Sequence, residues 1–121
     1  MTGDRDCFAH EATLTVAREF DHRGPGGAVT VALCGALEHD PPCPLAPHHT
    51  STSVNGTVSA VRVVFACDPA VEGLVRERIE SALAAGEFRH EGAVTRWTLV
   101  ATLPAALDAD DEALAARLAA P

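Results

Sequence analysis

The sequence contains no lysine, glutamine or tyrosine, and aromatic residues make up only 4% of its 121 residues. All nine basic residues are arginines, against 17 acidic residues, so the formal net charge at pH 7 is −8. A negative surface repels nucleic-acid phosphates and anionic lipid headgroups. We therefore expect neither nucleic acid nor a membrane surface among the partners. The lack of lysine beside abundant alanine is typical of GC-rich coding and indicates no function.

Long hydrophobic runs are also absent. The longest mainly apolar stretches are about half as long as the roughly 20 residues that a helix needs to cross a bilayer. The segment from Met1 to His10 has neither the basic start nor the apolar centre of a secretory signal. We therefore expect a cytoplasmic protein, in which thiols stay reduced. The four cysteines are then interpreted first as metal ligands or core thiols, and second as disulfides.

The chain length is that of one domain, because two separate cores would each have about half the residues and be marginally stable. We predict a single α+β domain over residues 1–121, with residues 1–10 as a mobile N-terminus. Strict alternation of apolar and polar residues predicts a first strand over Glu11–Phe20 and a second over Ala28–Leu37. A turn-forming cluster at residues 21–27 would join them as a hairpin. The prolines between residues 40 and 49 then exclude regular structure and predict a loop.

The second half of the chain has clearer signals. Asn55-Gly56 predicts a tight turn before a valine-rich third strand over Thr57–Cys67. Asp68 can cap a following helix, Pro69 suits its first position, and Gly86 suits its end.

A fourth strand is expected over Ala93–Leu103, and the acidic run at residues 108–112 favours the start of a final helix. The element order β-β-β-α-β-α predicts a mixed four-stranded sheet in which a right-handed crossover makes strands three and four parallel. The helices would cover one face. The other face, rich in Thr, Ala and Ser, would then be open to self-association.

One stretch concentrates metal-binding chemistry. Residues 34–49 hold two of the four cysteines and three of the six histidines: Cys34, His39, Cys43, His48 and His49. Zinc prefers tetrahedral sets of thiolate and imidazole ligands, and short spacings let one loop surround the ion. The prolines reduce the entropy lost when a metal orders the loop. We therefore predict a zinc site on a loop over residues 38–53, after the second strand.

Several points stay open at this stage. Either His48 or His49 could complete the tetrahedron, and a site with four protein ligands would be structural, whereas three would leave room for activated water. The alternatives to zinc are a chance cluster, a Cys34–Cys43 disulfide or a thiolate nucleophile. Cys67 is expected to be a buried, inert thiol, and Cys7 has no assigned role. Gly24–Gly27 is not predicted to bind phosphate, because it would join two strands rather than begin a helix.

These patterns predict a small zinc-binding protein that acts as a binding or accessory module, through a protein partner or self-association. The chain has no H-E-x-x-H motif and no zinc-deaminase pattern, so an enzyme is not expected. The alternatives are a hydrolase-like, zinc-dependent enzyme with an open metal site and a thiol redox sensor.

Overall fold

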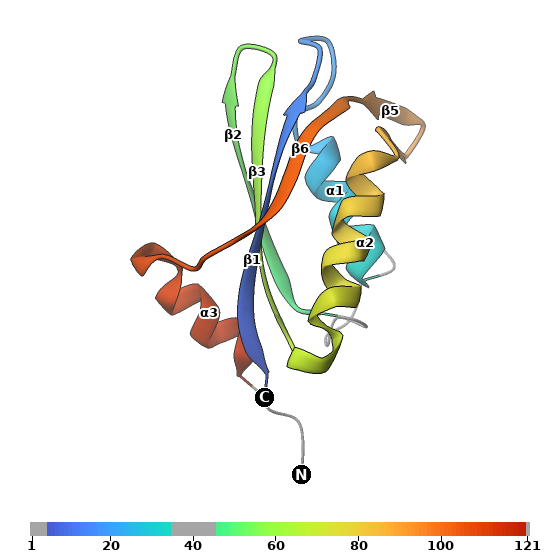
Figure 1. The fold of residues 1–121 in the computed structure, drawn as a ribbon. Helices are drawn as coiled ribbons and strands as arrows, with labels where there is room; N and C mark the ends of the chain where they lie inside the picture. Colours follow the sequence, from blue (N-terminus) through green and yellow to red (C-terminus); the bar gives the residue numbers. More distant parts are fainter. Residues whose placement is uncertain (1–4, 35–45, 121) are drawn as a thin grey trace.

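A computed structural model describes residues 5–34 and 46–120 of the chain. It confirms the α+β class with a four-stranded sheet, which runs in the order β2-β3-β1-β6 (Figure 1). The strands are β1 (Asp6–Thr15), β2 (His48–Asn55), β3 (Val58–Cys67), β4 (Glu87–His90), β5 (Ala93–Arg96) and β6 (Thr98–Ala105). The helices are α1 (Gly24–Cys34), α2 (Glu72–Ala84) and α3 (Glu112–Ala119). Strands β4 and β5 form a separate two-stranded hairpin.

The first strand lies at the centre of the sheet. The expected alternation is present, with Ala12, Leu14 and Val16 buried on one side. However, β1 begins at Asp6 and ends at Thr15, earlier than predicted. Residues 6–10 were expected in a mobile N-terminus and instead pair with β3. The segment that follows Thr15 leads into a helix rather than a second strand.

That helix, α1, is the main correction to the predicted fold. Ala28–Leu37 was expected to be a strand that forms a hairpin with the first strand. Instead, Gly24–Cys34 is helical, and this hairpin does not form. The alternation of Val29, Val31 and Leu33 is equally compatible with one turn of helix, since Val29 and Leu33 lie on the same face. Both of these side chains are buried, whereas Val31 is 36% exposed. Packing against α2 and the sheet therefore outweighs the modest helix propensity of the β-branched residues.

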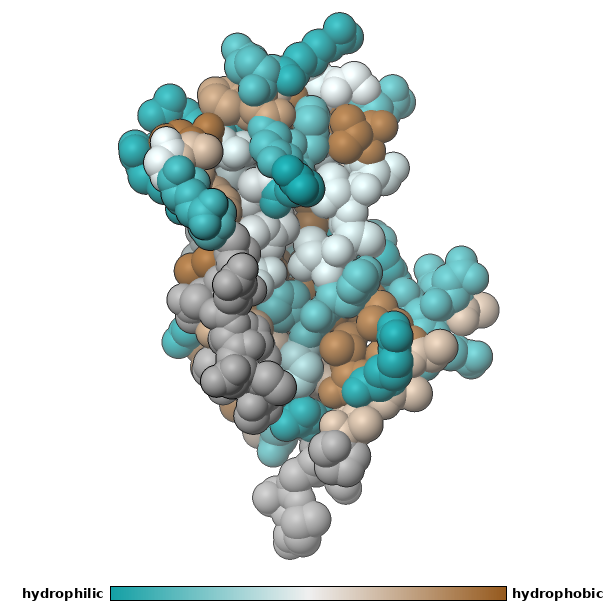
Figure 2. Space-filling model, turned by 180° about the vertical axis from the view of Figure 1, so that it is seen from behind, coloured by the Kyte–Doolittle hydropathy of each residue, from teal (hydrophilic) through white to brown (hydrophobic). Residues whose placement is uncertain are grey.

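The hairpin of β2 and β3 agrees with the turn prediction at Asn55-Gly56, and Gly56 has a φ of +64°. The loop prediction for residues 38–53 needs correction at its end, because β2 begins at His48. The unbroken pairing of β2 with β3 accounts for this extension. In the view from behind, residues of intermediate hydropathy cover the middle of the molecule, consistent with a Ser/Thr-rich strand at the sheet edge (Figure 2).

The caps predicted for the central helix are confirmed. The Asp68 carboxylate accepts a hydrogen bond from the Ala70 N–H at 2.9 Å, and Pro69 begins the 3₁₀ turn that leads into α2. Gly86 follows the helix with a φ of +72°. An added Cβ there would lie 3.0 Å from the Trp97 carbonyl oxygen, so glycine is needed for both conformation and space.

The predicted fourth strand is two strands, β5 and β6, that meet at Trp97. The sheet is entirely antiparallel rather than mixed, because β6 pairs with β1 and not with β3. The β4–β5 hairpin after α2 redirects the chain to the far side of β1. The expected right-handed crossover between strands three and four is therefore wrong.

Helices cover both faces of the sheet rather than one. Helices α1 and α2 lie on one side, and α3 lies on the other (Figure 1). Arg62 of β3 fixes this arrangement by ion pairs with Glu11 and Asp111, both at 2.6 Å. The main core fills the α1/α2 side and consists of Ala12, Leu14, Val16, Ala28, Val29, Leu33, Cys34, Ala46, Val61, Val63, Phe65, Cys67, Val75, Ile79, Leu83 and Trp97.

Candidate functional site

Two of the predicted zinc ligands meet where α1 ends and β2 begins. The Cys34 Sγ lies 3.6 Å from the His48 Nδ1, although the two residues are far apart in sequence. Cys34 is the last residue of α1 and is only 4% exposed, and His48 is the first residue of β2 and is half-buried. The contact lies at the edge of the core, beside the buried Ala46.

Strand alternation selects His48 rather than His49 for this position. His48 is paired with Phe65, which faces the α1/α2 core, so the two side chains share a face. His49 is the next residue and therefore lies on the opposite face, where it is exposed. The structure thus brings His48 to Cys34 and leaves His49 outside that contact.

The other neighbours of His48 define which nitrogen carries its proton. Nδ1 lies 3.2 Å from the Ala46 carbonyl oxygen, which can only accept a hydrogen bond, so in the neutral ring Nδ1–H is the donor. Nε2 lies 3.1 Å from the Thr30 Oγ1 and accepts from that hydroxyl. If a metal replaced the proton on Nδ1, the proton on Nε2 could be donated to Thr30 instead. Such a bond orients a metal-binding imidazole and increases its basicity.

The spacing of the two atoms fits a shared zinc ion. Zinc bound tetrahedrally, with Zn–S near 2.3 Å and Zn–N near 2.05 Å, holds sulfur and nitrogen roughly 3.6 Å apart. The observed separation of Cys34 Sγ and His48 Nδ1 is 3.6 Å. Two donors are too few for a zinc site. The remaining predicted ligands, His39 and Cys43, lie outside the described residues, and within residues 5–34 and 46–120 no group of three metal-binding side chains occurs.

The oxidation state of the sulfur is a second feature of the site. Cys34 belongs to a disulfide in this structure, whereas Cys7 and Cys67 are free thiols. Thiolate is the form of cysteine that binds zinc, so Cys34 must be reduced before it can act as a ligand. Zinc binding and the disulfide are therefore alternative states of the same sulfur.

The two free thiols do not belong to this site. Burial raises the pKa of the Cys67 thiol to about 11, and the negative charges of Glu72 and Asp68 add to the rise. Burial also raises the pKa of Cys7, whose thiol donates to the Ala115 carbonyl at 3.1 Å. Both thiols remain protonated at neutral pH, as expected for inert cysteines. Cys67 matches its predicted role as a buried thiol, and Cys7 connects β1 to α3.

A buried polar cluster around His10 was missed by the sequence analysis. His10 is 1% exposed, and Arg76 of α2 donates to its Nδ1 at 3.0 Å. Its Nε2 lies 2.7 Å from the Thr102 Oγ1 and 3.2 Å from the Glu80 Oε2. Since Arg76 takes the lone pair of Nδ1, Nε2–H is a donor and cannot remove a proton from Thr102. The arrangement joins β1, α2 and β6 and is structural rather than catalytic.

Alternation placed His10 on the core side of β1, which was the signal available in the sequence. The acidic and basic residues of α2 at positions 76 and 80 lie one turn apart and could have suggested partners for it. A second histidine pair, His22 Nδ1 with Ser59 Oγ at 2.9 Å, resembles a catalytic dyad in composition. Ser59 is fully buried, however, so this bond anchors the loop after β1 and does not present a nucleophile.

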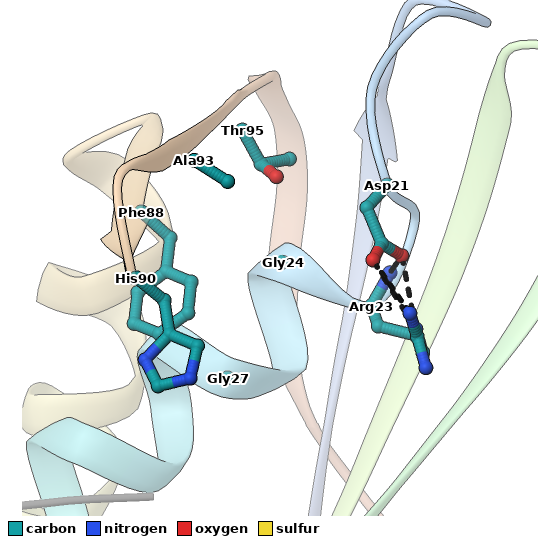
Figure 3. Close-up of a pocket in the computed structure, with 8 residues that line it drawn as sticks. All are labelled: Asp21, Arg23, Gly24, Gly27, Phe88, His90, Ala93 and Thr95. Atoms are coloured by element: carbon teal, nitrogen blue, oxygen red, sulfur yellow. Dashed lines mark hydrogen bonds and ion pairs between the residues drawn. The ribbon is translucent and has the colours of Figure 1, made fainter.

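A hollow lies at the other end of α1. A cavity of about 370 Å³ separates the start of α1 from the β4–β5 hairpin. Figure 3 shows Phe88 and His90 on one side, Ala93 and Thr95 at the hairpin, and Asp21 with Arg23 beyond Gly24. Gly24 and Gly27 form its floor, because a Cβ at Gly27 would lie 2.8 Å from the Phe88 ring. This cavity is separate from the contact between Cys34 and His48.

Comparisons with protein-family models, with curated proteins and with solved structures found no match to this chain. In the part of the chain that the structure describes, no helix is long and apolar enough to cross a membrane.

Proposed function

We propose that this chain is a small cytoplasmic zinc-binding protein, in which the metal joins the end of α1 to the start of β2. The observation that supports this most directly is the 3.6 Å separation of Cys34 Sγ and His48 Nδ1. His39 and Cys43 would supply the other two ligands, as their spacing in the sequence predicts. A bound zinc ion would cross-link this loop to the core.

The surroundings of the pair favour a structural site over an open one. The sulfur side of the pair is buried, since Cys34 is 4% exposed and Ala46 is fully buried, whereas His48 and Thr30 line an open hollow of about 360 Å³. Thr30 is positioned to hold the imidazole in one orientation through Nε2. A buried sulfur beside an oriented imidazole suits a metal that stabilises a loop, and it supports an accessory or binding role for the domain.

The partner in that role is proposed to be a second protein or a second copy of the chain. The sheet face beside α3 carries a shallow hollow of about 390 Å³ lined largely by small residues, among them Thr13, Ser51, Ser53 and Ala60. Small side chains on a sheet face allow close approach of another surface. Light scattering on the purified chain and affinity capture from its native lysate test this part, and a monomer that captures nothing would contradict it.

The metal itself is tested by elemental analysis. Untagged full-length protein, purified in reducing buffer, is expected to contain about one zinc ion per chain by mass spectrometry. Cys34→Ser and His48→Ala should lose the metal, whereas the neighbouring His49→Ala should retain it. Zinc-free protein after reduction and zinc addition would contradict the proposal, and metal loss in His49→Ala alone would contradict the choice of His48.

A second candidate, a thiol redox sensor, is favoured by the disulfide at Cys34. Cys43 is the proposed partner, because Cys7 and Cys67 are free. In the reaction, two thiols would lose two protons and two electrons, and a peroxide would be reduced to water or an alcohol. Peroxide should then remove two free thiols and release the zinc, and a reductant should reverse both changes. An unchanged thiol titration after peroxide would eliminate this candidate.

A further inference from the structure

Strand β2 forms one edge of the sheet, and the described residues leave that edge open. It pairs with β3 along its whole length without a bulge, and no other strand of residues 5–34 and 46–120 lies on its outer side (Figure 1). Residues 51–55 are exposed, whichever face of the sheet they are on. An unpaired edge is a template for a further strand, and native proteins therefore protect such edges.

The usual protections are present at the other edge of the sheet and missing from β2. Strand β6 contains Pro104, which has no N–H to donate, and its pairing with β1 shifts register after Thr13. Strand β2 has the sequence HHTSTSVN, with no proline, arginine or carboxylate. It also carries an exposed hydrophobic side chain, Val54. The difference between the two edges indicates that β2 is suited to receive a partner strand.

The pairing with β3 determines which backbone groups of β2 face outward. The Ala66 N–H donates to the Pro47 carbonyl at 2.9 Å, so Pro47 and every second residue after it direct their backbone groups toward β3. The residues between them, which include Thr50, Thr52 and Val54, direct their N–H and C=O groups to the open edge. These groups are positioned to bind a further antiparallel strand.

A second copy of β2 matches this edge along its full length. If two antiparallel copies meet at a two-fold axis through Ser51, then Thr50 lies opposite Thr52 of the second copy, and His48 lies opposite its Val54. Every outward residue of β2 then pairs with an outward residue across the axis. A displacement of the axis in either direction leaves an outward residue at an end of β2 without a counterpart.

The facing side chains favour a second copy as the occupant. Threonine pairs across antiparallel strands are stabilising, and this register places Thr50 opposite Thr52 on both sides of the axis. Each chain has a net charge of −8, but β2 brings no acidic side chain to the contact, so like charges do not meet there. A basic peptide, in contrast, would find no carboxylate on this strand.

The exposed Val54 also gains a place in this arrangement. The open hollow of about 360 Å³ on the α1 side of β2 is lined by His48, Thr30 and Gly26, among others. His48 and Val54 lie on the same face of the sheet, because side chains alternate along a strand. Val54 of the second copy would therefore lie against this hollow. Removal of both valines from water would stabilise the contact.

We propose that two copies of this chain pair through β2, as antiparallel strands about a two-fold axis at Ser51, and so join their sheets into one. The proposal rests on the partner role proposed above and deepens it, naming a second copy as the partner and β2 as the contact. The hollow on the α3 face borders the same strand at Ser51 and Ser53. The pairing uses backbone groups and does not require the metal.

Sedimentation equilibrium of the reduced, full-length chain measures the dimer. We expect a dissociation constant in the micromolar range, because one pair of strands is smaller than a standard protein interface. Val54→Asp should raise this constant roughly tenfold or more, since a carboxylate would be buried at the contact without a partner. Val58→Asp adds the same charge at a side chain of β3 that is 46% exposed, close to the 49% of Val54, and should leave the constant unchanged.

Cross-linking tests the register itself. The two Ser51 residues would face each other as a non-hydrogen-bonded pair, in which the Cα atoms are close enough for a disulfide. Mild oxidation of Ser51→Cys should therefore give a covalent dimer. Ser53→Cys is the matched control on the same strand and face. It would lie opposite His49 of the second copy, so it should cross-link no more than the parent chain.

Three results would overturn the proposal. The first is a chain that stays monomeric up to about 1 mM, where even a weak specific contact would form. The second is the same dimer dissociation constant for Val54→Asp and Val58→Asp. The third is cross-linking of Ser51→Cys no faster than that of Ser53→Cys.

Zinc content and capture of partners, measured on the same samples, separate this proposal from the proposed function. A zinc-loaded monomer that captures a different protein would reject only the pairing through β2. A zinc-free dimer that Val54→Asp dissociates would reject only the metal site. Neither Val54 nor Ser51 belongs to the predicted ligands, so both variants should retain the zinc content of the parent.

Discussion

The indole N–H of Trp97 donates to the carbonyl oxygen of Leu83 at 2.8 Å. Leu83 lies in the last turn of α2, where carbonyl groups have no partner within the helix. The backbone N–H of Trp97 also donates to the Gly86 carbonyl at 3.0 Å. One residue between β5 and β6 therefore closes the end of α2 and fixes the point at which the chain returns to the sheet.

Replacing Trp97 with Phe should therefore destabilise the fold by about 2 kcal/mol, through loss of the indole hydrogen bond and a smaller ring in the core. Urea unfolding followed by circular dichroism measures this change. Val100→Ala, at a side chain that is 61% exposed, is the control and should change the stability by less than about 0.5 kcal/mol. A Trp97→Phe variant as stable as the parent would show that the contact with Leu83 contributes little.

The bond between Thr30 and His48 gives a prediction about zinc affinity. Thr30→Val keeps the side-chain shape but removes the group that orients Nε2 of His48. The zinc dissociation constant of the reduced protein should rise roughly tenfold, the lower end of the range for such supporting residues. Competition with a chromophoric chelator provides the measurement. Thr52→Val, on the same face of β2 but further along the strand, should bind zinc like the parent.

The ion pair of Arg62 with Asp111 should hold α3 on the sheet in a pH-dependent way. The Arg62 guanidinium, bonded at 2.6 Å, holds the pKa of Asp111 below its usual range, and the N–H of Asp108 adds to this effect. A lowered folded-state pKa contributes stability above the unfolded pKa, near 4, and this contribution disappears as the pH falls through the folded value.

Asp111→Asn should consequently cost about 2 kcal/mol at pH 7 and progressively less below pH 4. Thermal or urea unfolding at several pH values tests this, with Asp110→Asn as the neighbouring control, since Asp110 makes no ion pair with the described residues. A difference between Asp111→Asn and the parent that stays constant down to pH 2 would argue against the ion pair as its cause.

His10 should make the fold less stable in mild acid. Burial lowers its pKa, and the nearby Arg76 adds to that effect, although the Glu80 carboxylate opposes it. The unfolded chain then binds a proton near pH 6.5 before the folded chain does, so stability is full above that pH and decreases as the pH falls toward the folded value. Part of the loss of stability between pH 7 and pH 5 should be absent in His10→Gln. Identical pH profiles of variant and parent would contradict this role of His10.

The sequence predicted those elements that carry local stop and start signals. Asn55-Gly56, Asp68 with Pro69, and Gly86 each impose a backbone geometry that few other residues satisfy, and the structure has the expected turn and caps at all three places. Their effect does not depend on the rest of the chain. For this reason β3 and α2 were predicted nearly within their true limits, whereas β2 was predicted to be part of a loop.

The incorrect predictions concern elements whose conformation depends on distant contacts. Residues 28–34 alternate like a strand, and only the packing of Val29 and Leu33 against α2 and the sheet decides for a helix. Pro25 in the first turn was a helix signal that the alternation outweighed. Strand direction was wrong for a similar reason, because nothing near Ala93 reveals that β6 pairs with β1.

For the proposed metal site, the sequence predicted five candidate ligands but could not choose between His48 and His49. That choice depends on the register of β2, which pairs His48 with Phe65 and so directs it to the α1 side. The register is set by the Asn55-Gly56 turn at the far end of the hairpin. The cavity at Thr95 had no signal in the sequence, since its walls come from α1 and from a hairpin much later in the chain.

The central position of β1 also constrains how the chain reaches this structure. Strand β1 pairs on one side with β3 and on the other with β6, so that Ala9 lies opposite both Val64 and Ala105. Such contacts between residues far apart in the sequence slow folding. The entropy of closing a long loop is lost before the strand pairing can stabilise the chain. During synthesis, the ribosome must make the chain through β6, which ends at Ala105, before β1 acquires its second neighbour. Until then one edge of this hydrophobic strand is available to chaperones, or to the wrong strand of another molecule.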